Sequence, residues 1–255
     1  MSTTAFFKHT SDFINKFLNI FGFAANFFYY SKNPNYEIIN SEFPVYAPWN
    51  KDKDFKELFK MIQSNTYIGK YRLYELWQLV GEVKKIPGAL IEVGVWRGGS
   101  GAIISKKAEL CGIKDTIYLC DTFKGVVKAD YDKDTLYKGG EHGDTSKKLV
   151  TDLIENKLKI KNVKILEGIF PNETKHLIKE HRFRFCHIDV DVYNSARDIV
   201  NWIWPKMPIG GIIVYDDYGH EECSGITRFV EEERKKTDRI IFYNLNGHAV
   251  VIKIG

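Results

Sequence analysis

The chain has 255 residues, of which 44% are hydrophobic and 27% are charged, and its formal net charge at pH 7 is +4. This length fits one large domain with a single core, and this composition excludes wholesale disorder. The lysines are scattered along the chain without a long basic run, which argues against a nucleic-acid-binding protein.

Residues 1–50 form an amino-terminal segment rich in aromatic side chains, with prolines in its second half. Asparagines and a lysine interrupt its apolar stretch, so it lacks the ~20 consecutive apolar residues of a membrane span. No signal-peptide pattern is present. We expect one amphipathic helix face that packs on the body of the protein or on a second copy, which favours a homo-oligomer. A lid over the substrate and contact with a membrane surface are the alternatives. The residues of this face are Phe13, Phe17, Phe21 or Ile20, Ala24 and Phe28.

The four cysteines show neither CxxC spacing nor companion histidines at zinc-binding intervals. Cys120 and Cys186 lie within apolar runs, where a free cysteine behaves as a small buried hydrophobic residue. This pattern favours a reducing compartment, and we expect the protein to be cytoplasmic.

Residues 51–255 carry the pattern of one domain. Two helices are predicted between residues 52 and 85, with a break near Gly69. Beyond them, predicted strands alternate with predicted helices, which indicates an α/β fold with a mostly parallel sheet. Asn246-Gly247 between the last two strands indicates an antiparallel hairpin. The predicted strands are 89–93, 116–120, 163–166, 183–188, 211–215, 239–244 and 249–254, and the predicted helices are 100–111, 147–157, 195–204 and 225–236.

A glycine-rich turn, Gly94 to Gly101, follows the first of these strands. Glycines let the backbone approach a ligand closely, and the amino terminus of the next helix offers free N–H groups. Such a turn is a weak signal by itself, because tight strand-to-helix turns need glycine in any case. Glu92 strengthens the signal because it lies at the carboxyl end of the strand, where open α/β sheets bind their ligands.

Asp121 closes the second strand, where its carboxylate can accept hydrogen bonds from both hydroxyls of a ribose. The glycine turn lacks the GxGxxG spacing that holds a pyrophosphate, so a nucleoside without phosphates fits better than a dinucleotide. S-adenosylmethionine is such a ligand, and its sulfonium favours a nearby carboxylate such as that of Glu92. The residues expected around it are Glu92, Gly94, Val95, Trp96, Arg97, Ser100, Asp121 and Thr122.

Two later strands end in paired acids, Asp189 with Asp191 and Asp216 with Asp217. Each acid alone would also fit a helix cap or a surface turn. Because parallel strands deliver their carboxyl ends to one edge, we expect Asp189, Asp216 and Asp217 to converge and to repel one another unless a cation lies among them. Mg²⁺ prefers such oxygen ligands and can lower the pKa of a substrate hydroxyl. Asp191 is then the candidate general base, or else it orients a water molecule. Weaker candidates for the base are His142, His187 and His220.

These stretches together resemble the macrocin O-methyltransferase (TylF-like) family, which includes the novobiocin and mycinamicin sugar methyltransferases. The resemblance runs from about Thr66 to the carboxyl terminus, and it rests on residues 91–99, 121–125, 187–195 and 208–218. It implies a Rossmann-like class I methyltransferase fold with S-adenosylmethionine and Mg²⁺ as cofactors. It also implies a small-molecule sugar or glycoside as the acceptor.

By motif position, the resemblance also implies roles for individual residues. Glu92, Asp121 and Asp189 correspond to cofactor residues, and Asp191 corresponds to the base. Thr66 and Arg72 resemble a segment that helps close the cofactor site. The metal ligands by position are Asp189, Asp216 and Asp217.

Two other functions stay open at this point. Asp189-Val190-Asp191 also fits the DxD motif with which glycosyltransferases bind the metal and diphosphate of a nucleotide-sugar, although the glycine turn and the second acid pair argue against it. A noncatalytic cofactor-binding subunit would be expected to lack these acids. The family pattern does not cover the aromatic amino terminus or residues 124–146, which we call the polar loop. It also differs at Val190 and Val192, where relatives commonly carry smaller or more polar residues. We expect the unmatched segments to determine the acceptor.

Overall fold

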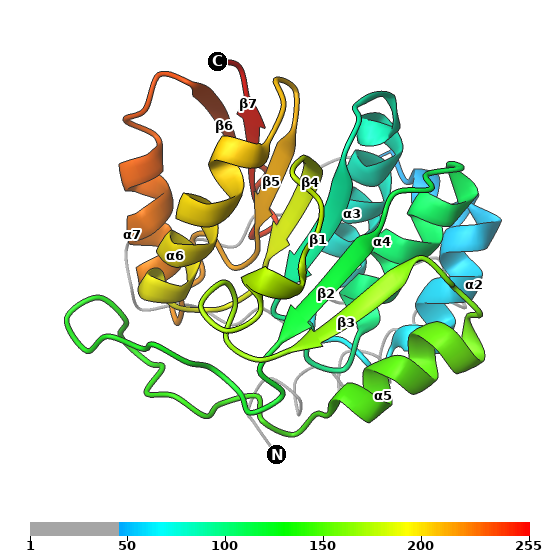
Figure 1. The fold of residues 1–255 in the computed structure, drawn as a ribbon, viewed down its shortest axis with the longest axis horizontal. Helices are drawn as coiled ribbons and strands as arrows, with labels where there is room; N and C mark the ends of the chain where they lie inside the picture. Colours follow the sequence, from blue (N-terminus) through cyan, green and yellow to red (C-terminus); the bar gives the residue numbers. More distant parts are fainter. Residues whose placement is uncertain (1–45) are drawn as a thin grey trace, which may run out of the picture. The chain divides into compact units, whose positions relative to one another are not determined.

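A computed structural model describes residues 46–255, so the predicted aromatic helix face lies outside the described residues. Trp49–Gly255 form one compact unit, in which a central sheet lies between two layers of helices (Figure 1). Within the described part of the chain, no helix combines the length and the apolar character that crossing a membrane requires. The division between residues 50 and 51 stays a prediction.

Within residues 46–255, seven strands form one sheet in the order β3-β2-β1-β4-β5-β7-β6. β1 to β5 pair in parallel, and β7 runs antiparallel to both of its neighbours. The predicted α/β fold with a mostly parallel sheet and a carboxyl-terminal hairpin is therefore confirmed. The strands are β1 (Ala89–Val93), β2 (Ile117–Asp121), β3 (Val163–Glu167), β4 (Phe183–Ile188), β5 (Ile212–Tyr215), β6 (Arg239–Tyr243) and β7 (Ala249–Lys253).

The helices also follow the predicted order. The break near Gly69 is confirmed, because Gly69 is the N-cap of α3. α2 begins after Asp52, whose carboxylate caps the helix by accepting the N–H of Phe55 at 3.0 Å. The helices are α2 (Lys53–Ile62), α3 (Lys70–Glu82), α4 (Gly99–Leu110), α5 (Lys147–Thr151), which continues into a π-helical segment (Asp152–Lys157), α6 (Tyr193–Ile203) and α7 (Ser224–Glu233). Single 3-10 turns lie at Pro48–Asn50, Val83–Lys85, Lys175–Leu177 and Trp204–Lys206.

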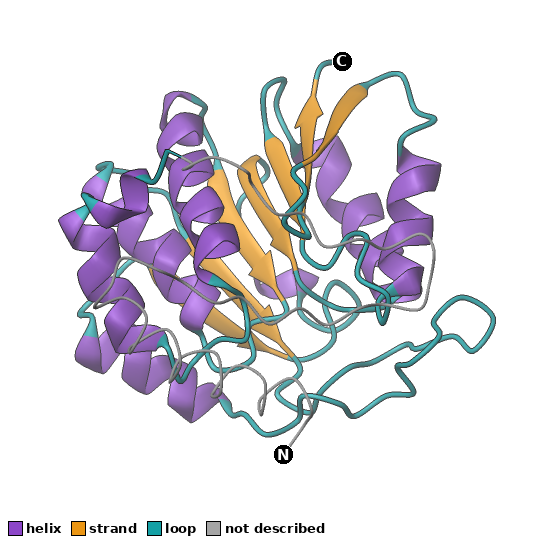
Figure 2. Cartoon of the chain, turned by 180° about the vertical axis from the view of Figure 1, so that it is seen from behind, coloured by secondary structure: helices purple, strands orange, loops and turns teal. Residues whose placement is uncertain are grey.

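Each face of the sheet carries one cluster of buried apolar side chains. On one face, α2, α3, α4 and α5 pack against strand residues such as Leu90 and Val214. On the other face, α6 and α7 pack against residues such as Ile91 and Tyr215. Figure 2 shows the strands between these two layers from behind. Because helices cover both faces, a ligand can reach the parallel strands only at an edge, and the carboxyl ends carry the predicted site residues.

Candidate active site

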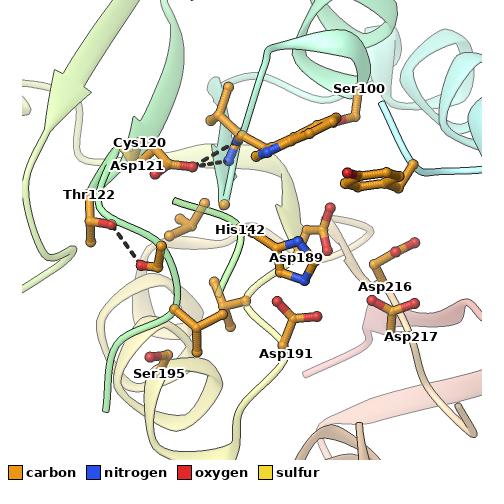
Figure 3. A pocket seen from close by; sticks show the side chains of 18 of the residues that line it. Ser100, Cys120, Asp121, Thr122, His142, Asp189, Asp191, Ser195, Asp216 and Asp217 are labelled. Atoms are coloured by element: carbon orange, nitrogen blue, oxygen red, sulfur yellow. Dashed lines mark hydrogen bonds between the residues drawn. The ribbon is translucent and has the colours of Figure 1, made fainter. Parts of the chain in front are cut away.

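A cavity of about 380 Å³ lies at the carboxyl ends of β1, β2, β4 and β5 (Figure 3). Its volume is within the range of about 300–1,000 Å³ that is usual for small-molecule sites. Glu92 and Arg97 are not among its lining residues, and neither is His187, whereas His142 and His220 are. The other sequence-predicted residues all line it: Thr66, Arg72, Gly94, Val95, Trp96, Ser100, Asp121, Thr122, Asp189, Asp191, Asp216 and Asp217.

The glycine turn packs directly on the segment that follows β4. Gly94 has a φ of 88°, and a Cβ atom at this position would lie 1.6 Å from the carbonyl oxygen of Asp189. The N–H of Gly94 donates to the carbonyl of Cys120 at 2.9 Å, and the N–H of Asp189 donates to the carbonyl of Val93 at 2.9 Å. At Gly94, the close approach that requires glycine is therefore made by the protein's own backbone.

Asp121 fixes the shape of the glycine turn. Its Oδ2 accepts the N–H of Val95 at 2.6 Å and the N–H of Trp96 at 2.8 Å, and its Oδ1 accepts the N–H of Phe123 at 2.6 Å. A carboxylate offers about four lone-pair positions, so these three bonds leave about one for a ligand. Asp121 lines the cavity with Ser100, which lies in the first turn of α4.

Glu92 and Arg97 make contacts outside the cavity. Glu92 is fully buried, with Oε1 at 2.8 Å from Nδ1 of His187, while its Oε2 has no hydrogen-bond partner among the described residues. Arg97 donates to the carboxylate of Asp144 at 2.6 Å and to its carbonyl at 3.0 Å. Arg97 thereby ties the polar loop to the glycine turn. Direct contact of either residue with a cofactor stays a prediction.

Asp189, Asp216 and Asp217 converge, and their carboxylate oxygens lie within 4.8 Å of one another. Figure 3 shows these carboxylates and that of Asp191 grouped at one side of the cavity. The protein itself supplies a cation, because Nη1 of Arg72 donates to Asp216 at 2.6 Å and to Asp217 at 2.8 Å. The repulsion expected from the sequence is thus partly balanced by a guanidinium. The three carboxylates still form the kind of oxygen donor set that suits Mg²⁺.

The carboxylates of this cluster differ in how easily they ionise. Burial and the charges of Asp216 and Asp217 raise the pKa of Asp189 well above its ordinary value. Burial and the charge of Asp216 raise the pKa of Asp217 to about 6. Burial also opposes ionisation of Asp216, but the hydrogen bond from His248 and the charge of Arg72 hold its pKa below the ordinary value. A divalent cation would relieve the repulsion that raises the first two pKa values.

Asp191 lies beside this cluster on a strained backbone, with a φ of 63°. The thiol of Cys223 donates to its Oδ1 at 3.7 Å. Burial and the charge of Asp217 raise the pKa of Asp191 to about 6, against the opposing effects of His142 and Tyr137. Such a carboxylate is ionised near neutral pH and basic enough to accept a proton from a substrate.

The polar loop forms part of the cavity wall, to which it contributes His142, a base candidate from the sequence, and Tyr137, which sequence reasoning missed. Tyr137 and His142 line the cavity, with the tyrosine hydroxyl 3.4 Å from Nε2 of the histidine. The loop is fastened to α6, where Asp134 caps the helix by accepting the N–H of Tyr193 at 3.0 Å. Its sequence has no hydrophobic periodicity, so the one usable signal was the presence of aromatic and histidine side chains among polar residues. Other lining residues that were missed are Asn65, Tyr67, Ile68, Phe170 and Ser195.

The profile of the macrocin O-methyltransferase (TylF) family matches residues 47–248 of this chain. Demethyldecarbamoylnovobiocin O-methyltransferase of Streptomyces niveus is 29% identical over 185 residues, which cover 69% of this chain and 70% of that protein. The 8-demethyl-8-(2,3-dimethoxy-alpha-L-rhamnosyl)-tetracenomycin-C 4'-O-methyltransferase of Streptomyces olivaceus is 27% identical over 172 residues, which cover 63% of this chain and 65% of that protein. Among solved structures, the O-methyltransferase NovP matches with a TM-score of 0.66 at 25% identity, over 75% of this chain and 83% of that chain.

Proposed function

The chain belongs to the macrocin O-methyltransferase (TylF) family, and we propose that it transfers a methyl group from S-adenosylmethionine to a hydroxyl of a sugar or sugar-containing small molecule, with the help of Mg²⁺. One observation carries this proposal: a glycine turn and a cluster of carboxylates from two further strands line the same cavity. The acceptor class is supported by the relatives, one of which acts on a rhamnosyl compound by its name.

The residues beside the glycine turn suit S-adenosylmethionine, which supplies a methyl group on a positively charged sulfur. Asp121 has about one lone-pair position left, enough to accept a hydrogen bond from a ribose hydroxyl. Thr66, Ser100 and Thr122 add hydroxyl groups to the cavity wall, and Asp189 adds a carboxyl group whose ionised form would favour a sulfonium. These residues would bind and orient the cofactor.

The carboxylates of Asp189, Asp216 and Asp217 would hold the metal ion. Bound Mg²⁺ supplies Lewis acidity, which lowers the pKa of an acceptor hydroxyl. Arg72 pairs with two of these carboxylates, so Arg72 and a divalent cation would compete for their oxygens. The guanidinium would then have to turn toward another partner when a cation binds.

We assign Asp191 the role of general base. Its carboxylate lies beside the metal ligands and would take the proton from the acceptor hydroxyl. The contact from Cys223 holds one of its oxygens in place. The remaining contribution of the fold is to orient the acceptor and to exclude water, for which the polar loop provides one wall.

Calorimetric titration with S-adenosylhomocysteine, compared with a nucleotide-sugar in Mg²⁺, tests the cofactor class. We expect S-adenosylhomocysteine to bind and the nucleotide-sugar not to bind. The reverse result would contradict the proposal and assign Asp189-Val190-Asp191 to a glycosyltransferase.

Mass spectrometry of reactions with S-adenosylmethionine tests the acceptor and the metal. A rhamnosyl glycoside and catechol, an aromatic diol, are offered separately, each with and without a chelator. We expect a methylated glycoside that disappears with the chelator. Methylation of catechol alone would contradict the sugar acceptor, and transfer that resists the chelator would contradict the metal.

We also propose that the chain forms a homo-oligomer in the cytoplasm. The support is its sequence: the apolar helix face expected in residues 13–28 and the absence of paired cysteine spacing. Sedimentation of the full chain tests whether it forms a homo-oligomer, and a monomer at micromolar concentration would contradict this proposal.

A further inference from the structure

His248 and Glu75 form a hydrogen-bonded chain that ends on Asp216, in which His248 and Asp216 are buried and the Glu75 side chain is 17% exposed. The His248 side chain is 0% exposed, its Nδ1 lies 2.5 Å from Oε2 of Glu75, and its Nε2 lies 2.6 Å from Oδ1 of Asp216. Both ring nitrogens thus face carboxylate oxygens, and both can donate only in the imidazolium form. Burial opposes that form, but the hydrogen bonds to the two carboxylates raise the pKa of His248 above its ordinary value.

Glu75 is itself held at a fixed position on α3. The side-chain amide of Asn246 donates to its Oε2 at 3.0 Å, and that of Asn244 donates to its Oε1. Asn246 also accepts the backbone N–H of His248 at 2.9 Å. The turn between β6 and β7 is therefore fastened to α3 through one carboxylate, and this contact fixes where the imidazole of His248 lies.

α3 holds Asp216 from two sides. Arg72, three residues before Glu75 and so on the same side of the helix, donates to Oδ2 of Asp216. His248, backed by Glu75, binds Oδ1. When a cation competes with Arg72 for Oδ2, Oδ1 stays fixed by the imidazole, so the carboxylate keeps its orientation.

We propose that His248 is a positioning residue: its imidazole, supported by Glu75, holds the Asp216 carboxylate in the orientation that binds the divalent cation. This inference rests on the proposed function, because it takes Asp216 to be a metal ligand. Side chains that bind the ligands of a metal fix their geometry, and losing one typically weakens metal binding by about 10–100-fold.

A contribution to folding stability alone does not explain why Glu75, His248 and Asp216 are charged. Burying His248, Asp216 and most of Glu75 removes charged groups from water, and buried ion pairs can often be replaced by apolar side chains without loss of stability. The charged arrangement ends on an oxygen of a proposed metal ligand, which gives it a use that apolar packing could not supply.

Two substitutions at His248 separate positioning from packing. The amide of asparagine takes the place of Nδ1, so His248→Asn keeps the contact with Glu75 and loses the contact with Asp216. The longer glutamine reaches the place of Nε2, so His248→Gln keeps a donor to Asp216. A matched control is Glu233→Gln, because Glu233 is also a buried carboxylate, paired with Arg239 at the opposite end of the sheet from the cavity.

The dissociation constant of Mn²⁺ is measured on the full chain by electron paramagnetic resonance of the free ion, beside the affinity for S-adenosylhomocysteine and the melting temperature. We expect His248→Asn to raise the Mn²⁺ constant by about 10–100-fold and His248→Gln to restore most of it. Affinity for S-adenosylhomocysteine should not change. Glu233→Gln should lower the melting temperature without changing the Mn²⁺ constant.

If His248→Asn does not fold, Glu75→Gln takes its place, since it keeps an acceptor for His248 and removes the charge; we expect it to weaken Mn²⁺ binding. Wild-type Mn²⁺ affinity in His248→Asn or Glu75→Gln, or an equal loss in Glu233→Gln, would overturn the positioning role while leaving the proposed function intact. A wild-type chain that binds no Mn²⁺ would instead contradict the metal in the proposed function, and the positioning role with it.

Discussion

Replacing Gly94 by alanine tests whether packing of the glycine turn determines where Asp189 lies. The added Cβ would lie 1.6 Å from the carbonyl oxygen of Asp189 and 2.6 Å from its carbonyl carbon. Both distances are well below the ~3.5–4.0 Å at which non-bonded carbon atoms attract one another best, so both are steric clashes. Either the turn or the segment after β4 has to move. The first movement displaces the proposed cofactor site, and the second displaces a proposed metal ligand.

The expected loss of stability in Gly94→Ala has two parts. At a φ of 88° an alanine side chain costs about 1–2 kcal/mol more than glycine. Forcing a methyl group into a packed site costs about 1–3 kcal/mol more. The free energy of unfolding should therefore fall by about 2–5 kcal/mol in Gly94→Ala.

Gly112→Ala is the matched control. Gly112 has a φ of 71° but no heavy atom within 4 Å of an added Cβ, so only the backbone part of the cost applies. Urea unfolding should show a loss of about 1–2 kcal/mol for this control. Calorimetry should show S-adenosylhomocysteine affinity unchanged in Gly112→Ala and weakened by about tenfold or more in Gly94→Ala, a loss of at least ~1.4 kcal/mol.

Equal losses of stability in the two variants would refute the packing argument, because they would mean that the turn accommodates the methyl group. A larger loss in Gly94→Ala with wild-type affinity for both S-adenosylhomocysteine and Mn²⁺ would refute the positional argument instead. The two conclusions can therefore fail separately.

Four further predictions concern three carboxylates, those of Asp121, Asp191 and Asp134. Asp121→Asn removes one acceptor oxygen from the glycine turn and should raise the calorimetric dissociation constant of S-adenosylhomocysteine by about tenfold, whereas unchanged affinity would contradict its role. Asp191→Asn should lower kcat by about 10²–10⁴-fold without weakening S-adenosylhomocysteine binding, and retained turnover would exclude it as the base. The pKa of Asp191 is about 6 and only its ionised form accepts a proton, so wild-type kcat/KM should rise with pH through about 6. A bound cation would shift this rise to a lower pH. A value of kcat/KM that is independent of pH from about 4 to 8 would contradict the role of Asp191 as the base. Asp134→Ala removes the acceptor for the N–H of Tyr193, which should lower the free energy of unfolding in urea by about 1 kcal/mol and raise the KM of the acceptor. An unchanged KM would mean that the polar loop does not contribute to acceptor binding.

Most of the fold could be predicted because each element carries its own local signal. The Gly69 break, the Asn246-Gly247 turn and the apolar runs of the central strands act within a few residues of the positions that they determine. The convergence of Asp189 with Asp216 and Asp217 could be predicted as well. It follows from a general property of parallel sheets, the alignment of their carboxyl ends, and needs no knowledge of individual contacts.

The contacts that decide the electrostatics of the cavity could not be predicted in this way. Arg72 meets Asp216 across 144 positions of sequence, and His248 meets Glu75 across 173. Nothing in the local pattern of either pair selects the other member. Glu92 shows the same limit: its place at the end of β1 was clear, but its pairing with His187 depends on how β4 packs beside β1.

The charges of Asp189, Asp216 and Asp217 do not by themselves determine which cation lies among them. Repulsion among three carboxylates is relieved by a positive charge nearby or by protonation of one of them, and Arg72 supplies part of the positive charge. The ion pairs of Arg72 go to Asp216 and Asp217, and the pKa of Asp189 stays well above its ordinary value despite the guanidinium. The case for a metal therefore rests on the carboxylate whose charge the protein leaves poorly balanced and on the geometry of the three donors. A divalent cation can bind all three oxygens at once, which the two hydrogen bonds from Nη1 of Arg72 do not.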